Sequence, residues 1–506
     1  PVVRLPDRTW PNLVIKRAPI WCSVDLRDGN QALSTPMGIT EKTEMFELLI
    51  AIGFKEIEVG FPSASQIEYD FIRKLIEGNH IPDDVTIQVI TQAREDLIRR
   101  TFESLKGVKR AIVHLYNSTS AVQRRVVFRK SRQGIIRIAA DAARVMAELR
   151  KESGNSGIRF QYSPESFPGT ELDFALDICH TALDVWRPTA EDKVILNLPE
   201  TVEMSTPNVY ADRIEWFLRN VRERRSIIMS VHTHNDRACA VAAAELAVMA
   251  GAERVEGALF GNGERTGNMD IITMALNLFS QGIDPKLNFG DLDRIREVYS
   301  RCTGMSVHPR HPYAGDLVFT AFSGSHQDAI HKGMRTRAKS GREVWDVPYL
   351  PIDPKDVGRS YGAIIRINSQ SGKGGIAYLM ERDWGILIPK EMQRDFSKAI
   401  QLRTEKDGVE LSSKEVHGCF EDEYLKERGP YRLRSCSIRT GSGPKNETTV
   451  SAMVRRAQET VRVAGSGNGP LNAFVNALRH QFEIPMDVMM YSEHALSRGS
   501  KARAIA

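Results

Sequence analysis

The feature of this sequence that most constrains its fold is a pattern that repeats from about residue 21 to residue 281. In each repeat a short run of β-branched residues, a turn and an amphipathic helix follow one another. The eight predicted strands are residues 21–26, 56–59, 85–90, 111–115, 158–162, 194–198, 227–231 and 254–259. Predicted helices follow at 41–52, 132–151, 172–185, 209–224, 238–250 and 269–280. Eight such units over about 250 residues are the number and length of a (β/α)8 TIM barrel.

An open, doubly wound sheet is the structural alternative to the barrel. Such a sheet usually has fewer units, and a glycine-rich phosphate-binding loop follows its first strand. Here the first strand ends in Arg27-Asp28-Gly29, which is not a loop of that kind. The pattern therefore favours an α/β fold with a (β/α)8 barrel.

The pattern stops after residue 282, and the rest of the chain predicts two further parts. Residues 283–413 are less periodic, contain clusters of Pro and Gly, and predict a linker with small helical subdomains. From residue 414 the sequence predicts an α+β domain of βββα type, with strands at 431–438, 448–455 and 460–463, a helix at 471–480 and a further strand at 486–491. That strand would begin a second βββα unit, which is incomplete at Ala506. The predicted domains are therefore 1–282, 283–413 and 414–506.

Composition excludes several classes of protein. The 506 residues are 42% hydrophobic and 26% charged, as in globular proteins, and no apolar run is as long as a membrane span or a signal core. A net charge of +5, spread along the chain, argues against a nucleic-acid surface. Six separated cysteines without a Cys-x-x-Cys pair indicate reduced thiols. We expect a cytoplasmic protein, or a mitochondrial one if a targeting peptide once preceded Pro1, with neither nucleic acid nor membrane as a partner.

A His-x-His pair at the end of the seventh predicted strand indicates a metal site. In an extended backbone the side chains of His232 and His234 face the same way and form half of a site. Asn235 and Asp236 are the predicted supports of these rings. An isolated pair of this kind is more often structural. Other predicted strands also end in polar residues, however, and the active site of a barrel lies at those ends.

The first and eighth strand ends complete the predicted ligand set. Asp28 adds a carboxylate oxygen and Asn268 can add a carbonyl oxygen, a mixture that suits Zn, Mn, Fe, Co or hydrated Mg. Open positions would let a substrate chelate the ion through neighbouring carbonyl and carboxylate oxygens, so that the ion polarises the carbonyl. Arg27 is placed to stabilise an enolate or alkoxide oxygen. A structural salt bridge to a barrel carboxylate is the alternative role for this arginine.

Three motifs carry a resemblance to a known family. Residues 25–33 (DLRDGNQAL), 232–237 (HTHNDR) and 261–268 (GNGERTGN) resemble the signature motifs of the 2-isopropylmalate synthase family, in its longer-chain subtype. This family belongs to the metal-dependent (β/α)8 acyl-CoA condensing enzymes. The resemblance continues at 322–329, 347–353 and 366–375 and covers nearly the whole chain.

The resemblance implies an acyltransferase that condenses acetyl-CoA with 2-oxoisovalerate and releases 2-isopropylmalate and CoA, the first committed step of leucine biosynthesis. It implies a divalent metal (Mg, Mn or Zn), with K as an activator. The implied metal ligands are Asp28, His232, His234 and Asn268. The implied substrate contacts are Arg27, Ile90, His114, Tyr116, Ser163, Asn197, Thr201 and Glu264. The implied catalytic residues are Arg27 and Glu165, together with His326 and Tyr349 acting from the partner subunit of a homodimer.

The C-terminal part resembles the family's regulatory domain, which binds leucine as a feedback inhibitor through two βββα units. Because the second unit stops at Ala506, leucine inhibition of this chain is an open expectation. Ala238, where glycine is usual, and Glu200, where alanine is usual, depart from the family pattern near the site. The alternatives are a homocitrate, citramalate or other 2-alkylmalate synthase, a metal-dependent acyl-CoA lyase, and a catalytically silent amino-acid sensor. The silent sensor would be expected to have lost the metal ligands.

Overall fold

A computed structural model describes residues 3–321, 323–340, 344–361, 373–407, 411–426, 429–441, 447–496, 499 and 502–506. Phe322 and most of the motif at 366–375 lie outside the described residues. The chain forms two compact units. One comprises Pro1–Phe319 with Pro351–Tyr361, and the other comprises Thr320–Leu350 with Gly362–Ala506.

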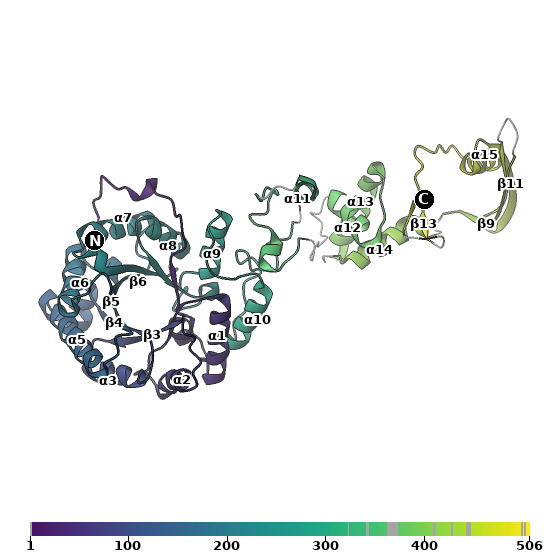
Figure 1. Cartoon of the computed structure of the whole chain (residues 1–506). Helices are drawn as coiled ribbons and strands as arrows, with labels where there is room; N and C mark the ends of the chain where they lie inside the picture. Colours follow the sequence, from purple (N-terminus) through teal and green to yellow (C-terminus); the bar gives the residue numbers. More distant parts are fainter. Residues whose placement is uncertain are drawn as a thin grey trace. The chain divides into compact units, whose positions relative to one another are not determined.

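The first unit contains a closed barrel of eight parallel strands in sequence order (Figure 1). The strands are β1 (Ile20–Ser23), β2 (Glu56–Gly60), β3 (Thr86–Gln92), β4 (Ala111–Ser118), β5 (Ile158–Glu165), β6 (Val194–Glu200), β7 (Ile227–Thr233) and β8 (Arg254–Gly257). β1 pairs with β8 over its whole length, which closes the barrel. Every residue of β2, β6, β7 and β8 is buried, because inward side chains fill the barrel and outward ones meet a layer of helices.

Helices surround the strands in Figure 1. They are α1 (Ile39–Ile52), α2 (Gln66–Glu77), α3 (Glu95–Ser104), the short α4 (Ala121–Gln123), α5 (Arg132–Ser153), α6 (Leu172–Trp186), α7 (Pro207–Asn220), α8 (Ala240–Met249) and α9 (Ile271–Ser280), and α10 (Leu292–Thr303) follows them. The predicted TIM barrel is confirmed. The helix predicted at 209–224 ends earlier, because Val221 is already extended.

The end of β1 differs from the prediction. Residues Asp25–Gly29, predicted in part as strand, form a π-helical turn after Ser23. Single π turns of this kind are frequent at functional sites. This turn carries Arg27 and Asp28 at the carboxyl end of the barrel.

The second unit has a helical part and a sheet. The helices are α11 (Gly324–Ser340), α12 (Lys373–Trp384), α13 (Lys390–Asp407) and α14 (Ser413–Phe420). The sheet has the antiparallel order β11 (Glu459–Gly467), β10 (Thr448–Arg456), β9 (Tyr431–Thr440), and α15 (Pro470–Phe482) packs on it. Val450, Val454 and Val463 of the sheet form a small core with Ala473 and Ala477 of α15. This is the βββα unit that the sequence predicts.

The prediction of a strand at 486–491 is wrong. These residues pair with no strand of the described chain, and the next strands are the short pair β12 (His494–Ala495) and β13 (Ala504–Ile505). The segment is held instead by Arg479 of α15, whose Nε donates to the carbonyl of Met486 at 2.7 Å. A strand needs a partner for its backbone groups, and a short apolar run does not supply one.

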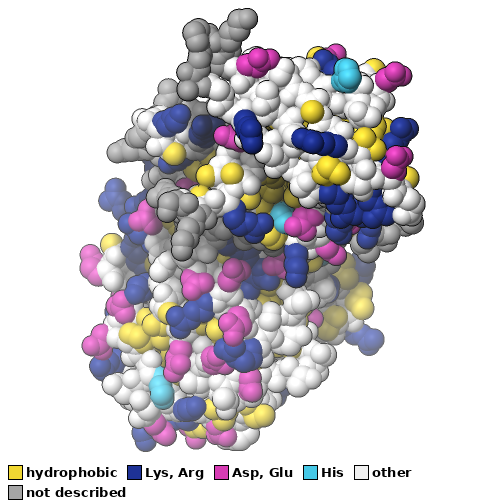
Figure 2. All heavy atoms as spheres, turned by 90° about the vertical axis from the view of Figure 1, so that its right-hand side faces the viewer, with side chains coloured by type: hydrophobic (Ala, Val, Ile, Leu, Met, Phe, Trp, Pro, Cys, Tyr) yellow, Lys and Arg dark blue, Asp and Glu magenta, His cyan; other side chains and the backbone are white. Residues whose placement is uncertain are grey.

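Charged side chains of both signs are interspersed on the face shown in Figure 2, as the near balance of 69 basic and 64 acidic residues predicts. Among the described residues, no helix is both long and apolar enough to cross a membrane.

Candidate active site

A cavity of about 250 Å³ opens at the carboxyl end of the barrel, and every strand or the turn after it contributes to its wall. The predicted site residues that line it are Arg27, Asp28, Ile90, His114, Tyr116, Ser163, Glu165, Asn197, Thr201, His232, His234 and Glu264. Sequence reasoning missed Gln31, Phe61, Pro199 and Arg265, which line it as well. Gln31 lies within the motif at 25–33 and Arg265 within the motif at 261–268, and these positions are the sequence signal for both residues.

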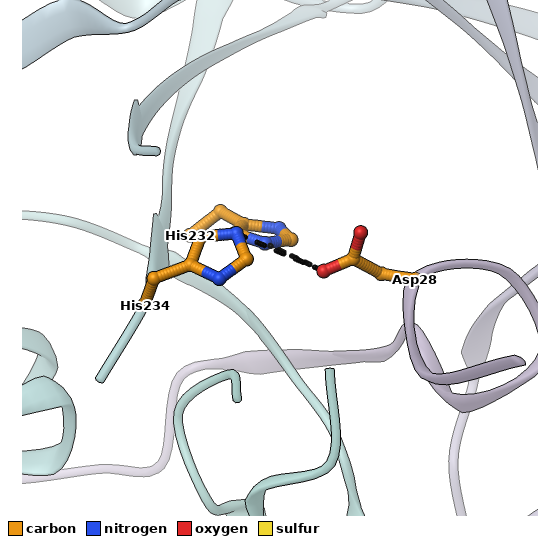
Figure 3. Close-up of side chains that lie close together, drawn as sticks. All are labelled: Asp28, His232 and His234. Atoms are coloured by element: carbon orange, nitrogen blue, oxygen red, sulfur yellow. Dashed lines mark ion pairs between the residues drawn. The ribbon is translucent and has the colours of Figure 1, made fainter. Parts of the chain in front are cut away.

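Asp28, His232 and His234 meet inside this cavity (Figure 3). The Oδ2 atom of Asp28 lies 3.6 Å from Nε2 of His232 and 3.7 Å from Nε2 of His234. All three side chains are buried, and Asp28 Oδ2 has no hydrogen-bond partner. One donor atom from each residue lies within 4.8 Å of the others, so the three surround a space that suits a cation.

Asn268, the fourth predicted ligand, is not among the residues that line the cavity, but its side-chain oxygen is also buried. Its Nδ2 donates to the carbonyl of Asn262 at 2.8 Å, and its buried Oδ1 has no partner. The loop before it is tightly packed, because a Cβ on Gly267 (φ +97°) would lie 1.9 Å from the carbonyl oxygen of Gly261. A bridge between the backbones of His234 and Asn268 ties this loop to the end of β7. A buried amide oxygen without a partner is a type of ligand that divalent cations accept.

The support of His232 comes from a residue that sequence reasoning missed. Nδ1 of His232 lies 2.9 Å from Oε2 of Glu256, a fully buried carboxylate of β8, which leaves Nε2 facing Asp28. The prediction that Asn235 and Asp236 hold the rings is wrong. Asn235 accepts from the backbone of Ala240 at 3.1 Å, and Asp236 accepts from Arg265. These two residues therefore stabilise the turn after β7 and its contact with the loop that carries Arg265.

The charges of the three candidate ligands are coupled. Burial alone would raise the pKa of Asp28, but Arg27 and the two histidines hold that pKa well below its ordinary value. Burial opposes protonation of His232, yet its contacts with Asp28 and Glu256 raise its pKa to about 9. Burial and the neighbouring His232 lower the pKa of His234 to about 4. Asp28 is therefore an anionic ligand and His234 a neutral ligand for a cation. A cation bound between Asp28, His232 and His234 would replace the proton on His232.

A second set of polar groups lies beside the first. Nε2 of His114 is 2.7 Å from Oγ of Ser163, and that hydroxyl accepts from Nδ2 of Asn197 at 3.0 Å. Nδ1 of His114 is 3.0 Å from Oε2 of Glu58. The wall of the cavity next to these groups includes Ile90 and Tyr116. Donors clustered beside an apolar wall suit a small molecule with a carboxylate at one end and an alkyl group at the other.

Arg27 joins the two sets. Its Nη1 lies 2.6 Å from Oδ1 of Asp28, and its Nε donates to Glu58. The predicted salt bridge to a barrel carboxylate therefore exists, and the guanidinium still lines the cavity. The two readings of this arginine are compatible, because the bridge fixes the orientation of a group that faces the cavity.

The candidate acid–base residues are divided between the two units. Glu165 lines the cavity and accepts a hydrogen bond from the hydroxyl of Ser118. His326 and Tyr349 belong to the second unit, where their rings stack with centroids 4.0 Å apart at 24°. Tyr349 is 61% exposed and has a left-handed backbone (φ +64°) that a non-glycine residue rarely adopts. Strain of this kind is typical of functional positions.

Three family models match successive parts of the chain. Residues 18–298 match the HMGL-like family model, residues 316–381 the model "Alpha-isopropylmalate synthase, post-catalytic domain-like", and residues 410–506 the model "LeuA allosteric (dimerisation) domain". The 2-isopropylmalate synthase of Rhodospirillum rubrum is 56% identical over 100% of this chain and 91% of its own length. The chain belongs to the 2-isopropylmalate synthase family. The family member of Parafrankia sp. is 57% identical over 100% of this chain and 90% of its own length.

Solved structures that resemble the chain include a hydroxymethylglutaryl-CoA lyase from Pseudomonas aeruginosa. It is 18% identical and covers 59% of this chain and 97% of its own length, with a TM-score of 0.48.

Proposed function

We propose that this chain catalyses the metal-dependent condensation of acetyl-CoA with 2-oxoisovalerate to give 2-isopropylmalate and CoA. The observation that carries the proposal is the joint geometry of the cavity, in which a cation-binding set and a carboxylate-binding set lie side by side and share Arg27. The names of the relatives support the same reaction.

Asp28, His232, His234 and Asn268 would hold the cation, Mg, Mn or Zn. When bound, such a cation supplies Lewis-acid polarisation of a keto oxygen. The two nitrogens and two oxygens of this set suit all three ions, and the supply of metal decides among them.

The chain's own residues bind and orient the oxo acid. Ser163 and His114 donate to its carboxylate, with Thr201 and Asn197 on the adjacent wall. Ile90 and Tyr116 bound its isopropyl group. Arg27 stabilises negative charge as it develops on the keto oxygen, since its guanidinium is already fixed before the reaction begins.

Condensation then needs a base and an acid. A base removes a proton from the methyl group of acetyl-CoA, and the resulting carbanion attacks the keto carbon. A C–C bond forms, the C=O π bond breaks, and the keto oxygen takes a proton to become a hydroxyl group. Water then attacks the thioester carbon, the C–S bond breaks, and the departing thiolate takes a proton that the water loses. Glu165 in the cavity wall, with His326 and Tyr349 from the partner subunit of a homodimer, are the groups that we assign to these proton transfers, with Glu264 facing the CoA side.

The C-terminal domain is proposed to join the two subunits and to bind leucine. Support comes from the matched dimerisation model and from a cavity of about 690 Å³ within this domain. That cavity lies between β9, α15 and the segment that follows α15, and its wall includes Leu433, Pro470 and Tyr491.

The test of the reaction is thiol release from acetyl-CoA with a panel of 2-oxo acids. We expect the highest kcat/KM with 2-oxoisovalerate and loss of release after chelation of divalent metal. A higher kcat/KM with another oxo acid would move the assignment to a sister 2-alkylmalate, homocitrate or citramalate synthase. No release with any oxo acid would contradict the proposal.

The assignment of the isopropyl pocket has a matched test on one strand. Ile90 of β3 lines the cavity, whereas Ile87 of the same strand is buried but does not line it. Ile90→Ala should shift the preference toward oxo acids with longer side chains by about tenfold, the value of one or two methylene groups in a pocket. Ile87→Ala should leave the preference unchanged. An unchanged preference in Ile90→Ala would contradict the pocket assignment.

A further inference from the structure

A buried amide lies beneath the cavity and hydrogen-bonds to two carboxylates at once. Gln88 of β3 is fully buried and does not line the cavity. Its Nε2 donates to Oε2 of Glu58 at 2.6 Å and to Oε1 of Glu256 at 3.1 Å. A side-chain amide nitrogen carries two hydrogens, so both carboxylates are served by one group.

The orientation of this amide is fixed by Arg254. Nη2 of Arg254 lies 2.8 Å from Oε1 of Gln88. A guanidinium can only donate, so the atom facing it must be the amide oxygen, and the NH₂ group must face the two carboxylates. Arg254 also lies 2.7 Å from Glu256, which keeps this carboxylate in place from a second direction.

Each of the two carboxylates holds one histidine of the candidate site. Glu256 holds His232 of the cation-binding set at 2.9 Å. Glu58 holds His114 of the carboxylate-binding set at 3.0 Å and also accepts from Arg27. Gln88 is therefore the link by which the support of one set is joined to the support of the other.

Contacts of Arg27 and Asp28 join the same two supports by a second route. Arg27 pairs with Asp28, and Asp28 faces His232. The closed circuit thus runs through Asp28, Arg27, Glu58, Gln88, Glu256 and His232. Its polar groups are almost completely removed from water, and in such surroundings a hydrogen bond is stronger and a missing one is more costly than at the surface.

We propose that Gln88 is a positioning residue that couples the cation-binding histidine to the histidine that binds the oxo acid. The inference rests on the proposed function, which assigns these two roles to His232 and His114. Removal of the amide leaves Glu58 and Glu256 each short of a donor. Both carboxylates then reorient toward other hydrogen-bond donors, and this changes the orientation of His114 and His232.

The test compares Gln88→Met with Gln161→Met in the full chain. Gln161 of β5 is equally buried, and its Nε2 donates to Glu256 at 2.8 Å rather than to Glu58. It is therefore the matched control that touches only one half of the circuit. The readouts are the Kd for Mn²⁺ of the metal-stripped chain by calorimetry, KM for 2-oxoisovalerate at saturating metal, KM for acetyl-CoA, and the thermal midpoint.

We expect Gln88→Met to raise both the Kd for Mn²⁺ and KM for the oxo acid by about tenfold, with KM for acetyl-CoA unchanged. Gln161→Met should raise the Kd for Mn²⁺ alone. An effect of Gln88→Met on only one of the two constants, or on neither, would overturn the proposal. An equal rise of both constants in Gln161→Met would also overturn it, because general loosening of the barrel floor would then explain both variants.

Gln88→Asn provides a second variant if Gln88→Met does not fold. Its amide is shorter by one methylene and cannot span both carboxylates, so the same double effect is expected with a smaller size. Failure of the proposed function is recognised separately, because the unmodified chain would then release no thiol with any oxo acid.

Discussion

The barrel cavity and the second unit place similar side chains in different surroundings. In the barrel, His114, His232 and Glu256 are buried, and each is oriented by at least one partner within hydrogen-bond distance. In the second unit, His326 is exposed and Tyr349 is 61% exposed, and the two rings stack on each other. The groups proposed to bind and polarise a ligand are thus held in place within one barrel. The groups of the second unit proposed to transfer protons are exposed, as residues that act at the barrel of a partner subunit must be.

The largest effect is expected from removing a buried group of the barrel. His232→Ala should abolish Mn²⁺ binding and lower kcat/KM by about a thousandfold or more, since a metal that polarises a carbonyl contributes several kcal/mol. Calorimetry and thiol release measure the two effects. His80→Ala, at an exposed position outside the cavity, is the control and should change neither. Turnover that persists in His232→Ala without bound metal would contradict the assignment of the site.

The next prediction tests whether the second unit acts on its partner's barrel. Asp28→Asn and His326→Ala should each be inactive alone, and mixing them after subunit exchange should restore about a quarter of the activity, because half of the dimers are then mixed and each has one intact site. The control is a mixture of Asp28→Asn with His232→Ala, whose defects lie in the same barrel. That mixture should stay inactive. If the first mixture also stays inactive, the two groups of residues do not act across subunits.

A smaller effect is expected at the sheet of the second unit. We propose that β9 lies in the interface between the two subunits, because its apolar Leu433 and Ile438, which also line the proposed leucine cavity, are 48% and 51% exposed. Leu433→Asp should weaken dimerisation by about 1.5–3 kcal/mol, the value of burying one such side chain, and leave the Kd for Mn²⁺ unchanged. Ile67→Asp, at an equally exposed position of α2, is the control. Sedimentation equilibrium that gives the same dimer constant for both variants would refute the proposed interface.

The smallest effect concerns a strain beside the cavity. Ala238 has a left-handed backbone (φ +59°) in the turn after β7. Ala238→Gly relieves about 1–2 kcal/mol of strain, and this gain exceeds the loss of about 0.4–1 kcal/mol that the greater entropy of the unfolded chain causes. The thermal midpoint of the barrel should therefore rise slightly. Ala243→Gly, inside α8, should lower it. A lower midpoint for Ala238→Gly, measured by calorimetry, would show that the turn carries no such strain.

Much of the barrel and the candidate site could be predicted from local sequence. Strand residues repeat with a clear period, and polar residues such as Asp28 and Glu165 stand directly at the ends of those strands. The placement of His232 and His234 on one side follows from the period of an extended backbone alone. These features depend on neighbours in sequence, and the structure confirms the barrel and brings these side chains to one cavity.

Features that depend on partners distant in sequence could not be predicted. Gln88, Glu58 and Glu256 are polar residues within three different strands, and only the closed barrel brings them together. The segment 486–491 is mostly apolar, as a strand can be, but strand formation depends on a partner that the described chain does not supply. The π turn at Asp25–Gly29 interrupts a strand pattern that continues in sequence.

The most direct test of the account is a titration of the metal-stripped chain with Mn²⁺ while thiol release from acetyl-CoA and 2-oxoisovalerate is followed. Thiol release should be absent at the start and should rise until one equivalent of metal per chain has bound, since Asp28, His232 and His234 form a single site. Full release before any metal is added would contradict the account.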